Sequence, residues 1–511
     1  MQRLIKSLFS RVFLFGLAII IQLFVLILVI WRFSNYFVFF YAILAVASLI
    51  AVLVILNGRS NPTYKLAWIV PILVFPIFGG LFYLMFGGSK SSRRNKRKML
   101  VIGLKMEDYL RQEPDVLREL EQDNPKAANQ ARYIDSYSFC PVYTHTTATY
   151  LTPGEIKFQR LLEELRKAER YIFLEYFIIE EGIMWNAVLE ILVEKARQGV
   201  DVRVIYDDVG CLMKLPYGYD QKLERLGIKC SIFNPFRPLL SVRLNNRDHR
   251  KIAVIDGHTA FTGGINLADE YINAYERFGH WKDASIEIKG DAVWNFVVMF
   301  LSLWEWLRGG NEDYERFRPW REHTRNFASD GFVQPFSDSP FDDEALGESV
   351  YLNLINQAER YVYINTPYLI LDNEMQTALR LAAKRGVDVR IVTPHIPDKW
   401  YVHAVTRSNY EILIETGVRI YEYTPGFMHS KTVVVDDQLA VVSTINLDYR
   451  SLFLHFECGV WLYKNNTIQE VREDFLQTLR VCQHITSEDC RHVKWYHRVI
   501  RSFLRMFAPL M

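Results

Sequence analysis

Two stretches of the chain carry the same reactive residues at the same spacing, His-x-Lys-x4-Asp. The residues are His249, Lys251 and Asp256 in the first copy and His429, Lys431 and Asp436 in the second. In each copy an asparagine, Asn266 or Asn446, follows 17 residues after the histidine. Histidine has a pKa near neutral and can act as nucleophile or general base, while lysine and asparagine can hold phosphoryl oxygens without a metal. The set predicts phosphodiester chemistry.

The duplication of the motif has a chemical reason. A single histidine cannot both attack phosphorus and hold a proton ready for the departing oxygen, whereas two histidines can divide these tasks. One copy of so short a pattern can arise by chance, but two copies with the same downstream asparagine are much harder to explain that way. We therefore expect both copies to form one active site.

Each motif is predicted to lie on a β-strand that continues into the core. Side chains alternate along a strand, so a histidine and a lysine two residues apart point to the same face. The apolar runs 252–255 and 432–435 extend the strand, and a turn leads into a second apolar strand at 259–262 or 439–442. That hairpin would return the asparagine toward the histidine.

The motifs lie inside a longer internal repeat. Three pairs of segments resemble each other: 168–178 and 358–370, 196–205 and 383–392, and 226–233 and 416–423. Each half is predicted to alternate strands and helices before its motif strand, which is typical of α/β units with buried strands. The sequence predicts an α/β fold of two similar domains, 131–325 and 326–490, with mixed, mostly parallel sheets.

The first 90 residues are predicted to form a membrane anchor. Segments 12–31 and 36–56 lack Asp, Glu, Lys and Arg and match the roughly 20 residues of a transmembrane helix. Segment 66–87 is also long enough, although its prolines suggest a kink, so the number of spans stays at two or three. Six basic residues within 90–98 place that end, and the catalytic part after it, on the cytoplasmic side of the cell membrane.

Two further segments flank the repeats. Residues 91–130 are predicted to be a basic linker with a lead-in helix. Residues 491–511 interleave basic and apolar side chains at helical spacing, which predicts a basic amphipathic helix that lies on the membrane or docks onto the catalytic core.

Composition excludes some classes of function. Lys plus Arg total 60 against 58 for Asp plus Glu, so the chain has no overall positive field of the kind that marks a general nucleic-acid binder. The six cysteines have no metal-ligand spacing, and we predict neither a metal site nor a cofactor.

With these motifs the chain resembles the phospholipase D superfamily and, within it, the bacterial cardiolipin synthases. The resemblance covers nearly the whole chain and includes the segments 61–87, 249–256, 364–370, 429–436 and 446–457. It implies transfer of a phosphatidyl group from one phosphatidylglycerol to another with release of glycerol. The implied intermediate is a phosphohistidine, with His249 as nucleophile and His429 as general acid and base.

The resemblance also implies supporting residues. A carboxylate before a later strand, Asp283 or Glu457, is expected to orient each histidine. The motif aspartates, Asp256 and Asp436, are expected to secure the strand and its turn rather than to transfer protons.

The small residues before each asparagine differ from the family pattern, which is Gly-Ser. The first copy has Gly263–Gly264 and the second has Ser443–Thr444. The first copy therefore lacks a hydroxyl here, and in the second copy we expect Ser443 to help bind phosphate.

Other functions are open at this point. The same site would be a phospholipase D-type hydrolase if water were the acceptor, or it could serve another phosphatidyl transfer. A nucleic-acid phosphodiesterase would leave the membrane segments unexplained, and a membrane scaffold would leave two intact motifs unexplained. The expected partners are phosphatidylglycerol, other anionic phospholipids and the bilayer, and not nucleic acid; the sequence does not give the oligomeric state.

Overall fold

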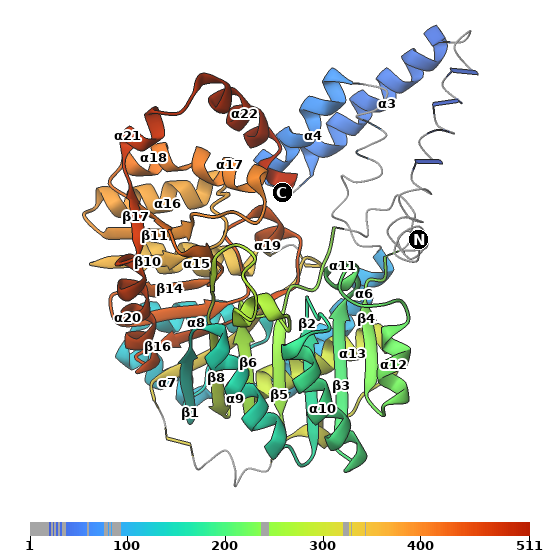
Figure 1. Ribbon diagram of the computed structural model, residues 1–511, viewed down its shortest axis with the longest axis vertical. Helices are drawn as coiled ribbons and strands as arrows, with labels where there is room; N and C mark the ends of the chain where they lie inside the picture. The colour runs from blue at the N-terminus through green and yellow to red at the C-terminus, as the bar shows by residue number, and fades with distance from the viewer. Residues whose placement is uncertain are drawn as a thin grey trace.

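The computed structural model describes residues 37–58, 61–75, 93–236, 245–319, 327–328, 330–342 and 344–510, with a few single positions and pairs before residue 84. Figure 1 shows two adjoining bodies of sheet and helix, the first repeat below and the second above it. The two bodies correspond to the two halves of the internal repeat.

The first repeat is built on a seven-stranded sheet. Its strands are β1 (Thr146–Leu151), β2 (Tyr171–Tyr176), β3 (Asp201–Asp207), β4 (Lys229–Phe233), β5 (Lys251–Ile255), β6 (Thr259–Gly263) and β8 (Ser285–Gly290). They are ordered β1-β8-β6-β5-β2-β3-β4.

The second repeat is built on an eight-stranded sheet. Its strands are β9 (Phe332–Asp338), β10 (Tyr361–Asn365), β11 (Asp388–Pro394), β12 (Arg419–Tyr423), β14 (Thr432–Val435), β15 (Leu439–Ser443), β16 (Glu457–Tyr463) and β17 (Cys482–Ile485). Read from β9, the order β9-β16-β15-β14-β10-β11-β12-β17 is that of the first sheet with β17 added. The predicted duplication is thus confirmed as a duplication of topology.

The prediction of mostly parallel strands is wrong. Only β2–β3, β3–β4, β10–β11 and β11–β12 pair in parallel within the two large sheets, and the other pairs are antiparallel. Parallel neighbours need a long crossover, here a helix, whereas a hairpin needs only a short turn. Each motif strand returns through such a hairpin, and the strands added after it continue the antiparallel pattern.

The helices and short 3-10 turns of the first repeat lie around its sheet. They are α9 (Gly154–Lys167), α10 (Ile183–Arg197), α11 (Asp208–Cys211), α12 (Tyr219–Arg225), η3 (Asp269–Ile272), α13 (Val293–Arg308) and η4 (Tyr314–Phe317). Ile172 and Leu174 of β2 pack in the same cluster as residues of α9 and α10, while Phe173 stacks on Phe300 of α13 with ring centroids 4.5 Å apart. Because β2 is covered on both faces, all of its residues are buried.

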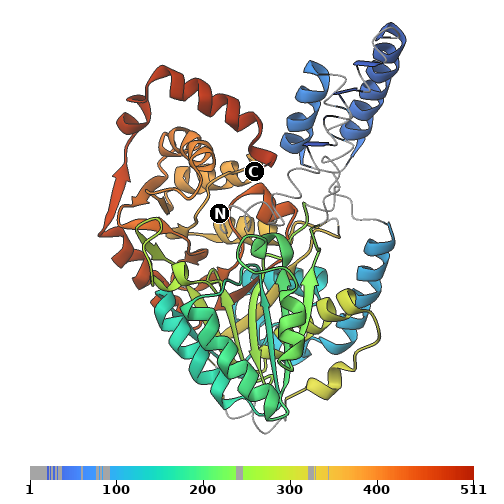
Figure 2. The ribbon, with the colours of Figure 1, turned by 45° about the vertical axis from the view of Figure 1, so that its right-hand side comes forward.

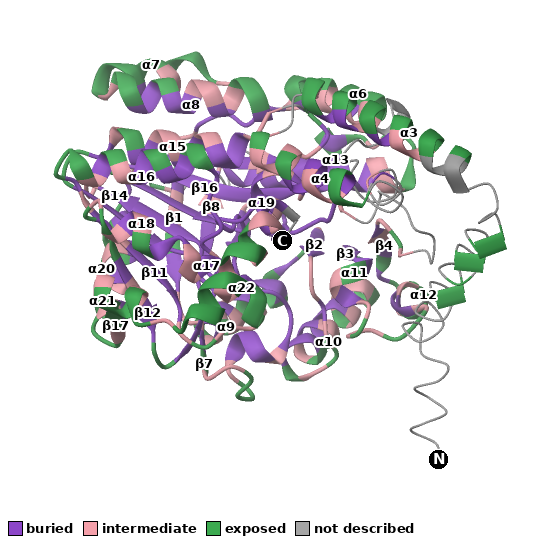
Figure 3. Ribbon diagram, turned by 90° about the horizontal axis from the view of Figure 1, so that it is seen from above, coloured by how far each residue is buried: buried purple, intermediate pink, exposed green. Residues whose placement is uncertain are grey.

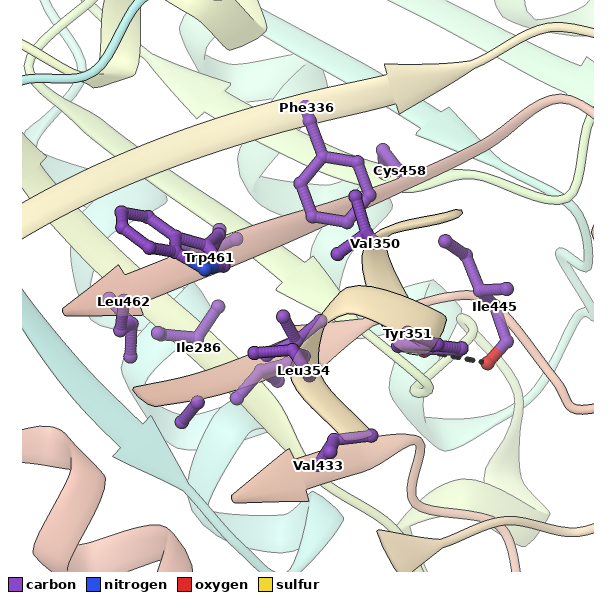
Figure 4. Close-up of a cluster of buried hydrophobic side chains, with 14 of the residues drawn as sticks. Ile286, Phe336, Val350, Tyr351, Leu354, Val433, Ile445, Cys458, Trp461 and Leu462 are labelled. Atoms are coloured by element: carbon purple, nitrogen blue, oxygen red, sulfur yellow. Dashed lines mark hydrogen bonds between the residues drawn. The ribbon is translucent and has the colours of Figure 1, made fainter. Parts of the chain in front are cut away.

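The second repeat has its own helices but shares a core with the first. Its helices are α15 (Leu346–Gln357), α16 (Asn373–Lys384), α17 (Trp400–Ser408), α18 (Tyr410–Ile414), α19 (Tyr449–Phe453) and α20 (Thr467–Leu479). Figure 4 shows Ile286 of β8 among Trp461 and Leu462 of β16 and Leu354 of α15. Helix α13 also contacts strands of both sheets. The two repeats therefore form one folded body.

Before the first repeat the chain is helical. Residues 93–138 contain α6 (Arg93–Tyr109), α7 (Pro114–Asp123) and α8 (Pro125–Ser138). Helix α8 packs against α15 and β9 of the second repeat, and Gln334 donates to the backbone oxygen of Ala131 at 3.0 Å. The segment predicted as linker and lead-in helix thus includes a structural part of the second repeat.

The N-terminal helices α3 (Phe37–Asn57) and α4 (Pro62–Val74) project together from the rest of the molecule (Figure 2). Most of the predicted span 12–31 lies outside the described residues, as does the end of 66–87, while 36–56 coincides with α3. Helix α4 has only 13 residues, fewer than the roughly 20 of a span. Among the described residues, no helix has the combined length and apolarity that crossing a membrane requires, and the predicted spans are not supported.

The chain ends in α21 (Ser487–Arg491), α22 (Trp495–Met506) and η5 (Ala508–Leu510). Helix α22 lies within the predicted amphipathic segment and packs against α17, while η5 contacts α4 and α19. Figure 3 shows exposed residues on the outward faces of helices such as α6, α7 and α22, around strands that are buried almost throughout.

Candidate active site

Both motif histidines lie just before the strand that runs from the motif lysine to the motif aspartate. Strand β5 begins at Lys251 and β14 at Thr432, so each histidine lies at the entrance to its strand. Lys251 Nζ donates to the backbone oxygen of His249 at 2.6 Å, and Lys431 makes the same bond to His429. Each motif thus places its ammonium group beside its own histidine.

The two histidines exchange carboxylate partners between the repeats. His249 Nδ1 lies 2.9 Å from Glu457 Oε1, and Glu457 belongs to the second repeat. His429 Nδ1 lies 2.6 Å from Asp283 Oδ2, and Asp283 belongs to the first. All four side chains are buried. Neither repeat therefore contains a complete set, and the two motifs form one site.

Backbone contacts join the repeats at the same two places. Strands β7 (His280–Lys282) and β13 (Gly426–Met428), one from each repeat, pair in parallel. The His429 N–H then donates to the backbone oxygen of Lys282 at 2.7 Å, and the His249 N–H donates to that of Phe456 at 2.9 Å. These bonds fix each histidine against the segment that holds its carboxylate partner.

The surroundings keep both imidazoles neutral. Burial lowers the pKa of His249 well below its usual value, and the charges of Lys251 and Lys431 lower it further. Burial and Lys431 lower the pKa of His429 to about 4, although Asp283 acts in the opposite direction. Since a ring nitrogen that faces an ionised carboxylate carries the proton, Asp283 assigns the Nδ1–H tautomer to His429, and Glu457 assigns it to His249 when its carboxyl group is ionised. Nε2 of each ring then has the free lone pair that a nucleophile or base needs.

Burial also weakens the charges of the neighbouring groups. It lowers the pKa of Lys251 to about 8 and that of Lys431 to about 7. It raises the pKa of Glu457 to about 8, against the effect of Lys251. A phosphate anion beside the lysines would favour their charged forms. The site is thus suited to an anionic ligand.

The motif aspartates lie at the other end of the motif strands. The Asp256 carboxylate accepts the backbone N–H groups of residues 169–171 at 2.7 to 2.8 Å. Asp436 accepts those of 359–361 at 2.7 to 2.9 Å. Both residues have positive φ, 51° and 54°, in the turn between the hairpin strands, as tight hairpin turns require. Their contacts fix the turn to the start of β2 or β10.

The two asparagines have different surroundings. Asn266 accepts the Ile178 N–H at 3.0 Å and donates to the Tyr271 hydroxyl at 2.7 Å. The Tyr271 ring lies 5.5 Å from the His429 ring, between centroids. Asn446 Oδ1 is buried and has no hydrogen-bond partner within the described part of the chain. Residues equivalent in sequence therefore differ in what they can offer a ligand.

The hydroxyl groups of the second copy serve the protein itself. Ser443 Oγ lies 2.7 Å from the Tyr351 hydroxyl and accepts the Ile445 N–H at 3.1 Å. Thr444 Oγ1 donates to the Glu457 carboxylate. The structure therefore places Ser443 in core contacts, while Thr444 supports the carboxylate that faces His249.

In the first copy, Gly264 takes the place of Thr444, and the carboxylate of Asp283 fills the space that a side chain would occupy. A Cβ atom added at Gly264 would lie 2.0 Å from Asp283 Oδ1. The Gly264 N–H also donates to the Ala284 backbone oxygen at 2.9 Å. A side chain at this position is incompatible with the contact between Asp283 and His429.

One residue of the site was missed in the sequence. The ring of His455 lies 5.7 Å from that of His249, between centroids. Its side chain is 11% exposed, and neither ring nitrogen has a hydrogen-bond partner among the described residues. His455 lies outside the repeated pattern. Its position two residues before Glu457 is the feature of the sequence from which its place in the site could have been predicted.

Three ligand atoms at this place could in principle hold a metal. Those of His249, His455 and Glu457 lie within 4.8 Å of one another, and such nitrogen and oxygen donors suit a transition metal. However, burial and the positive charges of Arg450, Arg247 and Lys251 lower the pKa of His455 well below its usual value. The same positive charges oppose the binding of a metal cation at this place and favour an anion.

Comparison with known proteins decides the family. Residues 161–279 and 351–479 match a family model described as "Cardiolipin synthase, PLD-like domain", and 46–88 match "Phospholipase_D-nuclease N-terminal". Cardiolipin synthase of Halalkalibacterium halodurans is 34% identical over 90% of this chain and 92% of its own length. That of Geobacillus kaustophilus is 36% identical, over 90% and 91%. The chain belongs to the cardiolipin synthase family. It is accordingly a phosphatidyltransferase of the phospholipase D superfamily.

Two further matches, one in sequence and one in fold, extend the comparison. An uncharacterized protein of Streptococcus mutans is 43% identical over 90% of this chain and 99% of its own length. The crystal structure of phosphatidylserine synthase from Haemophilus influenzae Rd KW20 aligns with a TM-score of 0.55 and 14% identity, covering 75% of this chain and 98% of that chain. That structure shares the fold.

Proposed function

We propose that this phosphatidyltransferase makes cardiolipin by transferring a phosphatidyl group from one phosphatidylglycerol to a second and releasing glycerol. The observation that carries the proposal is the reciprocal pairing of His249 with Glu457 and of His429 with Asp283. It supplies two buried imidazoles in one site, each with Nε2 free, which is what a two-step transfer requires.

In the first step, Nε2 of His249 attacks the phosphorus of the donor lipid. A P–N bond forms and the P–O bond to glycerol breaks, while protonated His429 gives its Nε2 proton to the glycerol oxygen. Lys251 and Lys431 stabilise the charge on the phosphoryl oxygens. Asn266 and Asn446 support this arrangement, Asn266 through Tyr271. The products are phosphohistidine and free glycerol.

In the second step, the terminal hydroxyl of another phosphatidylglycerol takes the place of glycerol. Neutral His429 accepts the hydroxyl proton as the oxygen attacks phosphorus. The P–N bond to His249 breaks, cardiolipin leaves, and His429 regains the proton that the next cycle needs.

The assignment of roles follows from the charges around the two rings. An attacking imidazole must be neutral, and at His249 burial and the nearby lysines all oppose protonation. A general acid must hold a proton. Burial and Lys431 keep His429 neutral in the free site, with a pKa of about 4, but Asp283, 2.6 Å away, favours its protonation, and so would the anionic phosphate of a bound lipid. His249 is therefore the nucleophile, and Asp283 is a positioning residue for the acid.

A lipid substrate implies that the enzyme acts at the cell membrane, and we place the catalytic repeats on the cytoplasmic side of that membrane. The match of 46–88 to the family's N-terminal model and the exposed apolar side chains of α3 and α22 support association with the membrane. The six basic residues within 90–98 are the reason to place the repeats on the cytoplasmic side. Purified protein should float with phosphatidylglycerol vesicles in a density gradient. Recovery of the protein only in the lipid-free fraction would refute membrane association.

Incubation of the purified full chain with phosphatidylglycerol in nonionic detergent tests the reaction. We expect cardiolipin and glycerol in equal amounts. Phosphatidic acid as the only lipid product would show hydrolysis and overturn the proposal. His249→Ala and His429→Ala should each abolish turnover, whereas His484→Ala, at an exposed position on the edge strand β17, should not.

The intermediate can be trapped with labelled lipid. Acid-labile phosphatidyl label should appear on the wild-type protein after a rapid quench and be missing from His249→Ala. Label on His249→Ala together with its loss from His429→Ala would reverse the two roles.

A further inference from the structure

Three carboxylates meet outside the catalytic set. Glu348 lies on α15, and Asp372 and Glu374 lie at the start of α16. Each offers one oxygen, and these oxygens lie within 4.8 Å of one another. The two helices come from the same repeat, and Asp372 is the N-cap of α16. None of the three side chains has a role in the proposed transfer.

Two of these carboxylates are withdrawn from solvent. Glu348 is 8% exposed and Asp372 is 2% exposed. The Glu348 Oε1 atom is buried and has no hydrogen-bond partner within the part of the chain that the structure describes. A buried carboxylate oxygen without a donor is costly, and such an atom calls for an ion, a water or a proton.

The charged groups that act on Glu348 are other carboxylates, and they do not offset its negative charge. Burial and the carboxylates of Asp372, Glu374 and Asp338 all raise the pKa of Glu348, to about 9. Like charges at this separation cannot all remain ionised without a counterion. Either a proton is shared within the cluster or a cation binds to it.

We propose that Glu348, Asp372 and Glu374 bind a hard divalent cation, preferentially Ca²⁺. Carboxylate oxygens are the ligands that such cations prefer. The three ligand atoms all lie within 4.8 Å of one another, which is close enough for one such cation. Three protein carboxylates favour Ca²⁺, because Mg²⁺ keeps several waters and is usually held by only one or two carboxylates. Glu374 is exposed, so water can complete the coordination from that side.

The oxygens of Asp372 keep acceptor capacity for a cation. Oδ1 accepts the Met375 N–H at 2.9 Å and Oδ2 accepts from Asn61 Nδ2 at 3.0 Å. A carboxylate has about four acceptor positions, so each oxygen retains one. The hydrogen bonds fix the carboxylate for binding.

The site lies where the N-terminal helices meet the second repeat. Asn61, which contacts Asp372, is also the N-cap of α4 and accepts the Thr63 N–H at 2.9 Å. A bound cation would fix Asp372 and, through Asn61, the start of α4. It would at the same time hold α15, whose Tyr351 contacts Ser443 next to the active site. The cation thus links α4 to the catalytic repeat.

Calorimetric titration of the EDTA-treated, dialysed full chain in lipid-free nonionic detergent tests the proposal. We expect one Ca²⁺ per chain with a dissociation constant of about 10⁻³ M or lower, and weaker binding of Mg²⁺. No binding up to about 10 mM Ca²⁺ would overturn the proposal and leave the shared proton as the explanation of the cluster. Tighter binding of Mg²⁺ would overturn the preference for Ca²⁺.

Variants locate the cation. Glu374→Gln, at an exposed position where folding is not at risk, should weaken Ca²⁺ binding at least about tenfold, and Glu348→Gln should abolish it. Glu411→Gln, at an exposed acid on α18, is the matched control and should bind as the wild type does. Unchanged affinity in Glu374→Gln and Glu348→Gln would refute the site. Because no lipid is present, this outcome is independent of the proposed cardiolipin synthesis.

Discussion

The substitution Gly264→Ala tests how the first repeat controls the histidine of the second. The new Cβ atom would lie 2.0 Å from Asp283 Oδ1, so the carboxylate must move. It then loses its 2.6 Å contact with His429 Nδ1 and its 2.8 Å bond from the Ala284 N–H. Loss of one charge-assisted hydrogen bond costs about 1.5–3 kcal/mol. Since about 1.4 kcal/mol is a factor of ten in rate, kcat should fall about 10- to 100-fold.

The assay is steady-state turnover of phosphatidylglycerol over a range of pH. Asp283 positions His429 and does not touch the lipid, so KM should change less than about threefold. Asp283 raises the pKa of His429, so its displacement should move the alkaline limb of kcat to lower pH. Gly103→Ala on α6, where the nearest atom to the added Cβ is 3.4 Å away, should behave as the wild type. Full activity of a correctly folded Gly264→Ala protein would refute the reasoning.

Three other substitutions follow from the same contacts. Asp256→Ala removes the acceptor of three backbone N–H groups and should lower the free energy of unfolding by about 2–4 kcal/mol in chemical denaturation; an equally stable but inactive variant would contradict this. The pKa of Lys431 is about 7 and that of Lys251 about 8, so kcat/KM should fall as alkaline pH removes their charges. Lys431→Arg should shift that fall to higher pH, and an unchanged profile would exclude Lys431 as its cause. His455→Phe should change the free energy of unfolding by less than about 1 kcal/mol, because neither ring nitrogen has a hydrogen-bond partner in the described part of the chain; a much lower melting temperature would show that the 3.8 Å approach of His455 Nδ1 to Glu457 Oε1 contributes to stability.

Much of the fold followed from local pattern. The motif strands and hairpins could be predicted because apolar runs alternate with turn residues, and β5–β6 and β14–β15 pair as such a pattern requires. The direction of the outer strands could not be predicted. Antiparallel β16, for example, is buried throughout, as a parallel strand would be, and its residue types do not show which way its neighbours run. Their pairing depends on where the chain returns in space, which no short window contains.

For the candidate site, too, the sequence predicted part of the arrangement and the structure supplied the rest. Spacing alone grouped His249, Lys251 and Asp256, and the aspartate was expected to secure the strand and its turn. In the structure Asp256 lies at the far end of the strand and accepts backbone N–H groups. Asp283 was expected to orient a histidine, but the sequence did not show that this histidine, His429, belongs to the other repeat. His455 escaped notice because it belongs to no repeated pattern and reaches the site through its contact with His249.

The sequence by itself determined the reactive groups, their duplication and the α/β character of each half, because residue type, spacing and strand periodicity are local properties of the chain. The tertiary structure alone decided that Glu457 faces His249 and Asp283 faces His429. Those pairs join residues 208 and 146 positions apart, and only the packing of the two sheets on one core brings them within hydrogen-bonding distance. The site is complete only when both repeats are folded together.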